Sequence, residues 1–321
     1  MIESISPQAI AITFVVSVIA IWLSFRIGLW NTRDHTLWKR YGAGSDIVRI
    51  DGVDIRIKDE GDGPALILVH GAFGNLNFWD SWANELIAKG YRVVRFDGPP
   101  EGISGLDEKG HSHDRLAQLI PMLADKLKIE QFAVGGTSRG GPAAMICAAK
   151  HPGRVTGLIL TQTPVYNYDL PKFPIKLRIA QFLTNTIFAG YRPRYYWRQY
   201  LGNIFDDKSA LTPEIVCEYT DFSNRSGHRE ILAAIQAPGQ SRDRERNREM
   251  AGSIKAPTLI LATPNDNVLS LEHQRTLASW FPAESCKLVV LPNGGHFPPF
   301  EPHTQSARIV REFLDETRSD D

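Results

Sequence analysis

A serine between glycines is the first group in the sequence with the setting of a nucleophile. Residues 136–140 read GTSRG, after an apolar run at 132–135 and before an apolar stretch of helical character. A G-x-S-x-G pattern between a strand and a helix forms a turn so sharp that the serine Oγ projects above the sheet, and larger side chains at the glycine positions would collide. The pattern predicts Ser138 as a nucleophile. A phosphate loop is disfavoured, because the P-loop lysine and the G-x-G-x-x-G spacing are both missing.

His296 is the histidine best placed to activate this serine. A serine hydroxyl is a weak nucleophile near neutral pH and needs a base within hydrogen-bond reach. Of the nine histidines, His296 follows the last predicted strand, at the end of the glycine-softened loop LPNGGH at 291–296. In a parallel sheet this loop emerges at the same carboxyl edge as Ser138. We therefore predict His296 as the general base.

The base in turn needs a carboxylate that fixes its tautomer and stabilises its protonated form. Asp266 is the only carboxylate in the segment 263–267, directly after the predicted strand 258–262. The chain order of Ser138, Asp266 and His296 is a nucleophile–acid–histidine order known for this kind of turn. Asp266 could instead cap a turn, and Asp169, after the strand that ends near residue 161, is the reserve acid.

A developing oxyanion needs backbone N–H groups aimed at it. The predicted strand 65–69 runs into the small-residue loop HGAFG at 70–74, which can approach the serine closely. We predict the amides of Ala72 and Arg139 as the oxyanion-hole donors, with Phe73 as the neighbouring alternative to Ala72. His70 is expected to hold the loop in shape rather than to react.

Short apolar segments that alternate with helical ones must position these residues. Residues 47–59 alternate polar and apolar side chains around the dipeptide at 51–52, Asp-Gly, which predicts a β-hairpin. Further apolar runs predict six buried strands, at 65–69, 92–96, 132–135, 157–161, 258–262 and 287–291. The helical stretches between them indicate an α/β fold with a doubly wound, mostly parallel eight-stranded sheet.

The segment between residues 164 and 250 interrupts this alternation. It is rich in aromatic residues and arginine, as in YRPRYYWRQY at 191–200, and shows no clear strand. We predict a helical cap at 165–250 over the carboxyl edge of the sheet, where ligands bind in such folds. The core then comprises residues 41–164 and 251–321.

The N-terminal residues predict a single-pass membrane anchor. From residue 9 to 25 every side chain is apolar or a small hydroxyl, and continuation to Trp30 gives about 33 Å of helix, enough to cross about 30 Å of hydrocarbon. Residues 1–40 would be the anchor and juxtamembrane segment, and the basic residues after the span place the catalytic domain in the cytoplasm. A cleaved signal peptide fits less well, because a basic start and a good cleavage site are missing. A helix packed on the protein or on a partner is the other alternative.

Composition narrows the class of ligand. The 36 basic and 36 acidic residues give no net charge, which argues against nucleic acid as a partner. Cys147, Cys217 and Cys286 are odd in number and lack metal-site spacing, and His111 and His113 have no further ligand pattern around them. We expect a small-molecule substrate and neither a metal nor a cofactor.

Three motifs in order, HGAFG, GTSRG and GGHFPPFEP, lie within residues 46–314 and resemble the α/β-hydrolase fold superfamily. The resemblance implies a serine hydrolase in which Ser138, His296 and Asp266 cleave a carboxylic ester or related acyl compound through an acyl-enzyme. The same triad serves amidases, thioesterases, carbon–carbon bond hydrolases and acyltransferases. A non-catalytic binding member of the fold is a further alternative.

Two positions depart from the family pattern. Pro100 replaces the first glycine of a loop that here reads DGPPEGIS at 97–104, and Thr263 replaces a glycine three residues before the predicted acid. Serine rather than aspartate at position 138 argues against haloalkane dehalogenase and epoxide hydrolase chemistry, which the family performs with an aspartate nucleophile.

Replacing Ser138 by alanine should abolish turnover of short p-nitrophenyl esters and leave folding intact, because the change removes the nucleophilic oxygen alone. Hydrolysis rates and circular dichroism of the two proteins check this expectation. Unchanged turnover in the variant would overturn the assignment of Ser138 as the nucleophile.

Overall fold

An eight-stranded sheet forms the centre of the computed structural model, which describes residues 6–167, 173–188, 190–227, 231, 233, 243–301 and 303–319. The strand order is β1-β2-β4-β3-β5-β6-β7-β8. The strands are β1 (Asp46–Ile50), β2 (Val53–Glu60), β3 (Ala65–Val69), β4 (Arg92–Phe96), β5 (Phe132–Thr137), β6 (Val155–Thr161), β7 (Thr258–Ala262) and β8 (Cys286–Val290). β1 and β2 form the predicted hairpin, and β2 is antiparallel to β4. All other pairs are parallel, so the predicted mostly parallel α/β sheet is confirmed.

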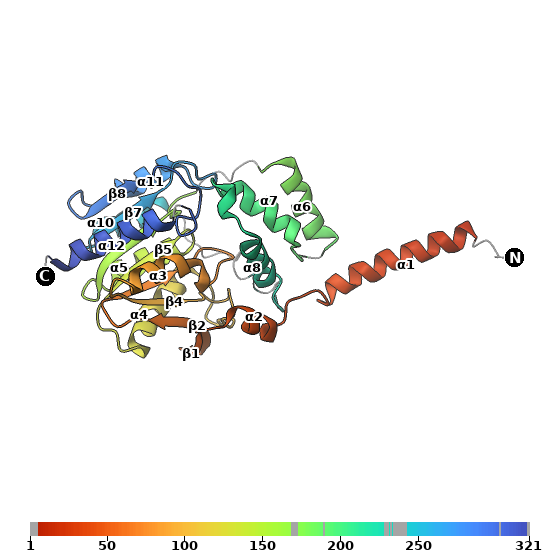
Figure 1. Ribbon diagram of the computed structural model, residues 1–321, viewed down its shortest axis with the longest axis horizontal. Helices are drawn as coiled ribbons and strands as arrows, with labels where there is room; N and C mark the ends of the chain where they lie inside the picture. The colour runs from red at the N-terminus through yellow and green to blue at the C-terminus, as the bar shows by residue number, and fades with distance from the viewer. Residues whose placement is uncertain are drawn as a thin grey trace.

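Helices cover both faces of this sheet (Figure 1). One layer contains α4 (His113–Lys126), α5 (Gly140–Lys150), α10 (Arg244–Ser253) and α11 (Leu271–Ala278), and the other contains α3 (Asp80–Ile87) and α12 (His303–Ser319). In β3, Ile67 and Val69 pack into the first layer, whereas Leu66 and Leu68 pack into the second. A strand buried on both faces needs apolar side chains at every position, which explains the continuous apolar runs in the sequence.

The chain between β6 and β7 forms helices beyond the carboxyl ends of the strands (Figure 1). These are α6 (Ile175–Thr186), α7 (Arg194–Ile204), the short 3₁₀ helix η2 (Lys208–Ala210) and α8 (Pro213–Ser223). Aromatic side chains of α7 and α8 pack together, as in the contact of Trp197 with Tyr219 at 5.1 Å between ring centroids. We refer to α6, α7, η2 and α8, with the described residues that connect them and the two residues after α8, as the cap. The predicted range 165–250 also includes residues outside the described part of the chain.

The N-terminal helix α1 (Pro7–Arg26) projects from the body, and none of its residues is buried (Figure 1). It is long and apolar enough to cross a membrane, by length and composition. The residues after it are fastened to the cap: Thr32 N donates to Asn224 O at 2.8 Å, and Arg225 pairs with Asp34 at 2.7 Å. In α2 (Asp34–Tyr41) the side chain of Leu37 is fully buried. The part of the predicted juxtamembrane segment after residue 31 therefore belongs structurally to the globular body.

Candidate active site

Ser138 lies on a turn that only close packing can maintain. It follows β5 directly and has φ of 47°, a left-handed backbone conformation that non-glycine residues rarely adopt. A Cβ on Gly136 would come within 2.4 Å of Gly140 O, and one on Gly140 within 2.3 Å of Val69 O. These distances are the collisions that the G-x-S-x-G pattern predicts. Ser138 is half-buried, whereas its neighbours on both sides are buried, so the turn presents this residue to solvent.

Asp266 and His296 meet at the carboxyl edge of the sheet, after β7 and β8. His296 Nδ1 and Asp266 Oδ2 are 2.8 Å apart, and the Asp266 side chain is fully buried. The other carboxylate oxygen accepts from Val268 N at 2.7 Å. Because the carboxylate accepts the proton on Nδ1, a neutral His296 carries its free lone pair on Nε2, as a general base requires. Asp169, the reserve acid, lies outside the described residues.

Ser138 Oγ makes no hydrogen bond with the described residues. Of the three predicted catalytic side chains, only Asp266 and His296 are therefore joined by a direct bond among these residues. In free enzymes the bond between nucleophile and base is often long and tightens when substrate binds. The catalytic roles of Ser138, Asp266 and His296 therefore stay predictions, now with the acid–base pair formed.

The loop after β3 approaches Ser138 closely, as the oxyanion prediction requires. A Cβ on Gly71 would lie 3.0 Å from Ser138 Cβ. Within the described part of the chain, no acceptor binds the amides of Ala72 and Arg139, whereas Phe73 N donates to the Glu101 carboxylate. The geometry thus favours Ala72 over Phe73 as partner of Arg139 in an oxyanion hole.

Glu101 joins the two loops that carry these amides. Its Oε1 accepts from Phe73 N, and its Oε2 accepts from Arg139 Nη1 at 2.7 Å. Arg139 Nη2 also donates to His111 O at 2.9 Å, and both charged side chains are buried. Glu101 lies in the loop where Pro100 departs from the family pattern, and no motif in the sequence indicates a role for it.

His70 holds the oxyanion loop in shape, as expected. Gly98 N donates to His70 Nε2 at 2.9 Å, so the ring proton resides on Nδ1, which lies 2.7 Å from Gly71 O. One imidazole therefore links the loop after β3 to the loop after β4.

Thr263, the second departure from the family pattern, supports the histidine loop. Its hydroxyl donates to Gly295 O at 2.6 Å and accepts from the buried Gln162 side chain. A glycine at position 263 would supply neither bond. The hydroxyl thus fixes the backbone immediately before His296.

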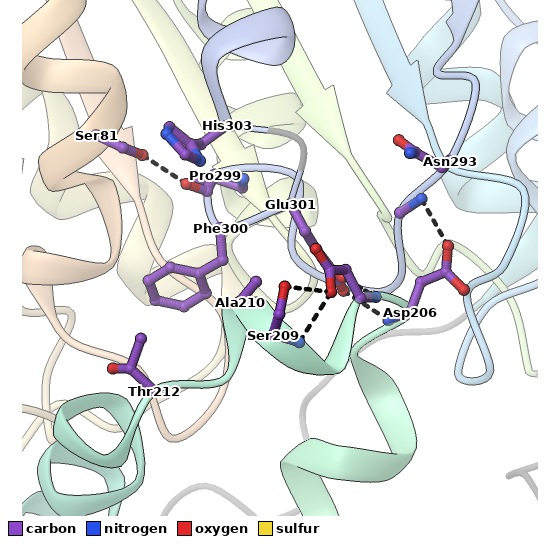
Figure 2. A pocket seen from close by; sticks show the side chains of 12 residues that line it. Ser81, Asp206, Ser209, Ala210, Thr212, Asn293, Pro299, Phe300, Glu301 and His303 are labelled. Atoms are coloured by element: carbon purple, nitrogen blue, oxygen red, sulfur yellow. Dashed lines mark hydrogen bonds between the residues drawn. The ribbon is translucent and has the colours of Figure 1, made fainter.

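Glu301 fastens the end of cap helix α7 to the loop that carries His296. Its carboxylate accepts from Asp206 N at 2.8 Å, Asp207 N at 2.6 Å and Gly295 N at 3.1 Å, beside a cavity of about 560 Å³ (Figure 2). Burial raises the pKa of Glu301 above its ordinary value, although the three amide donors act in the opposite direction. The segment GGHFPPFEP contains Glu301, but the motif alone did not indicate what the carboxylate binds.

Further bonds link the same end of α7 to both catalytic loops. His296 N donates to Ile204 O at 2.9 Å, and Asp206 Oδ2 accepts from Gly294 N at 3.1 Å and from Asn265 Nδ2 at 2.8 Å. The positions of the acid loop and the base loop therefore depend on the cap as well as on the sheet.

The three cysteines are free thiols, and burial raises the pKa of Cys147 to about 12, so this thiol stays protonated. No group of three or more His, Cys, Asp or Glu side chains in the described ranges could hold a metal ion. Neither observation assigns a second chemistry to the site.

Comparisons with known proteins support the fold. A sequence model of the alpha/beta hydrolase fold matches residues 64–302. The chain is 27% identical over 272 residues to a 2-hydroxymuconate semialdehyde hydrolase of Pseudomonas sp. strain CF600. The alignment covers 83% of this chain and 92% of the relative.

Two solved structures share the fold at lower identity. A meta-cleavage product hydrolase of Pseudomonas fluorescens IP01 aligns with a TM-score of 0.71 and 24% identity, over 84% of this chain and 97% of that one. A membrane phospholipase A, described as a bacterial virulence factor, aligns with a TM-score of 0.68 and 22% identity, over 96% of this chain and 98% of that one.

Replacing Glu301 by alanine should lower the free energy of unfolding by about 1–3 kcal/mol and lower kcat, because buried amides lose their acceptor and the loop of His296 loosens. Denaturant unfolding and ester hydrolysis measure the two effects. Glu312→Gln, on the exposed surface of α12, is the control and should change neither.

The wild type should also gain stability relative to Glu301→Ala as the pH falls toward 4.5. The raised pKa means that the Glu301 carboxyl binds its proton more tightly in the folded state than in the unfolded state. This stabilisation is therefore complete below the pKa of the unfolded state and is lost as the pH rises through the pKa of the folded state. Equal stability and kcat in wild type and variant would contradict a role for Glu301 in fastening the cap.

Proposed function

Because this chain belongs to the α/β-hydrolase fold family, we propose that it is a membrane-anchored serine hydrolase that cleaves a carboxylic ester through an acyl-enzyme. The observation that carries the proposal is the 2.8 Å contact between His296 Nδ1 and the buried Asp266 carboxylate, at the same sheet edge as the Ser138 turn. A bonded, buried acid–base pair at the same sheet edge as a presented serine suits acyl transfer.

In the proposed mechanism, Ser138 Oγ attacks the ester carbonyl carbon while His296 Nε2 takes the hydroxyl proton. The amides of Ala72 and Arg139 donate to the oxyanion, and each such donor typically contributes about 10²–10³ in rate. Collapse of the tetrahedral intermediate breaks the carbon–oxygen bond of the ester, and the imidazolium of His296 protonates the departing alcohol. Water, deprotonated by His296, then attacks the acyl carbon. The bond from that carbon to Ser138 Oγ breaks, the imidazolium returns its proton to Oγ, and the acid leaves.

The exposure of α1 supports the proposed anchor. An apolar helix of 20 residues with no buried side chain costs free energy in water and is stable in a bilayer. Phe25, near its end, packs on Phe188 and Tyr191 of the cap at 5.1 and 5.4 Å between ring centroids. The cap would then lie next to the membrane surface, and the basic residues after the span favour a cytoplasmic catalytic domain.

Apolar side chains on the cap point to the same arrangement. On α6, Ile175, Ile179 and Phe182 are spaced for one helix face and are 63%, 52% and 64% exposed. α6 lies at the end of the body from which α1 projects (Figure 1). The similarity to a membrane phospholipase A, over nearly the whole chain, is compatible with an ester substrate drawn from lipid.

A carbon–carbon bond hydrolase is the second candidate. It is favoured by the names of two similar proteins, a 2-hydroxymuconate semialdehyde hydrolase and a meta-cleavage product hydrolase. The same triad could serve that reaction, so an assay with a substrate of each kind must distinguish the two candidates.

The full-length protein in detergent micelles should hydrolyse p-nitrophenyl butyrate and bind one fluorophosphonate per chain, at Ser138. Turnover assays and peptide mass spectrometry measure both, with Ser138→Ala as the unlabelled control. The kcat/KM for the ester should exceed that for 2-hydroxymuconate semialdehyde. A higher kcat/KM for 2-hydroxymuconate semialdehyde would show a carbon–carbon bond hydrolase instead of an ester hydrolase. Absence of the fluorophosphonate label at Ser138 would refute the proposal of a serine hydrolase.

Deletion of residues 1–24 should move the protein from the membrane to the soluble fraction and keep turnover of p-nitrophenyl butyrate within about twofold, since the deleted part of α1 contributes no buried side chain. Fractionation and activity assays check this result. A full-length chain found in the soluble fraction, or a mature protein whose intact mass lacks the apolar segment, would exclude the anchor.

A further inference from the structure

Arg192, in the cap, is a buried cation that has no carboxylate partner among the residues that the structure describes. Its side chain is 7% exposed, and its Nη1 is buried with no hydrogen-bond partner. Within the described part of the chain, no carboxylate pairs with its guanidinium. The guanidinium carbon lies 5.5 Å from the centroid of the Phe73 ring and 5.7 Å from that of Tyr196.

The other buried arginines of the described residues all have carboxylate partners. These pairs are Arg56 with Asp97, Arg95 with Glu60 and Asp80, Arg115 with Asp107, and Arg139 with Glu101. A buried charge without a partner is strongly destabilising, and stacking on aromatic rings offsets only part of that cost. Among the buried arginines of the described residues, Arg192 is therefore the one whose charge an anion from outside the chain would stabilise most.

The backbone of Arg192 is held in place, which limits movement of the side chain toward solvent. Its N–H donates to Asn224 Oδ1 at 2.7 Å, and Asn224 Nδ2 donates to its carbonyl oxygen at 2.7 Å. Asn224 is itself buried at the end of α8, where its backbone oxygen accepts from Thr32 N. The guanidinium, whose Nη1 has no hydrogen-bond partner in the described residues, thus belongs to a loop whose backbone is held by Asn224.

The guanidinium stacks on a residue of the loop that carries the candidate oxyanion donor Ala72. Phe73, on which it stacks, directly follows Ala72, the predicted oxyanion donor, and the same loop approaches Ser138 through Gly71. Trp197 of the cap packs against the Phe73 ring at 5.7 Å. An anion bound to Arg192 would therefore lie between the cap and the loop that borders the nucleophile.

We propose that Arg192 binds an anionic group, a carboxylate or a phosphate, of the ester that Ser138 attacks. The inference rests on the proposed ester hydrolase and narrows its substrates to esters with a negative charge. A guanidinium suits both groups because its planar N–H donors match two anionic oxygens at once. The charge could come from a soluble carboxylate ester or from the phosphate of a membrane lipid.

The test compares charged and neutral esters in two pairs, with the full-length protein in detergent micelles. The soluble pair is p-nitrophenyl hydrogen glutarate and p-nitrophenyl pentanoate, and the lipid pair is dioctanoyl phosphatidylglycerol and dioctanoylglycerol. The variants are Arg192→Gln, Arg192→Lys, and the control Arg198→Gln on the exposed part of α7.

Arg192→Gln should lower the ratio of kcat/KM for the charged ester to that for the neutral ester by about ten- to hundredfold, mainly through KM. Arg192→Lys should retain part of the ratio, and Arg198→Gln all of it. A loss in the soluble pair alone identifies a carboxylate, and a loss in the lipid pair alone identifies a lipid phosphate. The proposal is overturned if Arg192→Gln leaves the ratio unchanged in both pairs. An equal loss of kcat/KM on charged and neutral esters is such a result, because it does not change the ratio.

A binding measurement separates this proposal from the proposed function. In the Ser138→Ala background, which needs no turnover, calorimetry should show that Arg192→Gln weakens binding of glutarate monomethyl ester or of dioctanoyl phosphatidylglycerol at least tenfold. Equal binding of both ligands with and without Arg192 would refute the anion site even in an active esterase. Absence of all ester hydrolysis by the wild type would refute the esterase and leave this measurement valid.

Discussion

The left-handed turn at Ser138 is the constraint on which the rest of the site depends. A non-glycine residue in this conformation costs about 1–3 kcal/mol, and the surrounding structure must supply that free energy. It does so through two glycines that allow the backbone to approach Val69 and the start of α5, and through a bond from Ser138 N to Thr161 O at 3.0 Å. The turn thus depends on both strands beside β5, and it can form only when the sheet is assembled.

The cap is bonded to the loops of the predicted acid and base and is not a separate cover. The end of α7 binds the loop of His296 through Ile204 O and through Glu301, and it binds the loop of Asp266 through Asp206. The same cap receives the residues that follow α1, through Thr32. A displacement of the cap would therefore be transmitted to the acid–base pair, and the proposed anchor would act on the cap first.

Buried charges are concentrated around the loop that borders Ser138. Glu101 and Arg139 form an ion pair. The Glu101 carboxylate also accepts from Phe73 N, so this amide is not free to donate to an oxyanion. Arg192, which stacks on the Phe73 ring, has no such partner in the described part of the chain. The contrast between a paired and an unpaired guanidinium beside one loop is what makes an anionic substrate the natural complement of this site.

The sequence alone determined the elements and motifs that depend on local rules. Continuous apolar runs specify doubly buried strands, and glycines at 136 and 140 specify the turn at Ser138. The loops after the last two strands predict Asp266 and His296 as a pair, and their side chains do meet. Only the tertiary structure decided which amide near Ser138 stays unbonded, and it revealed the roles of Glu101 and Glu301. The physical reason is distance along the chain: Glu101 meets Phe73 across 28 residues and Glu301 meets Asp206 across 95, so these bonds arise from packing that no local pattern encodes.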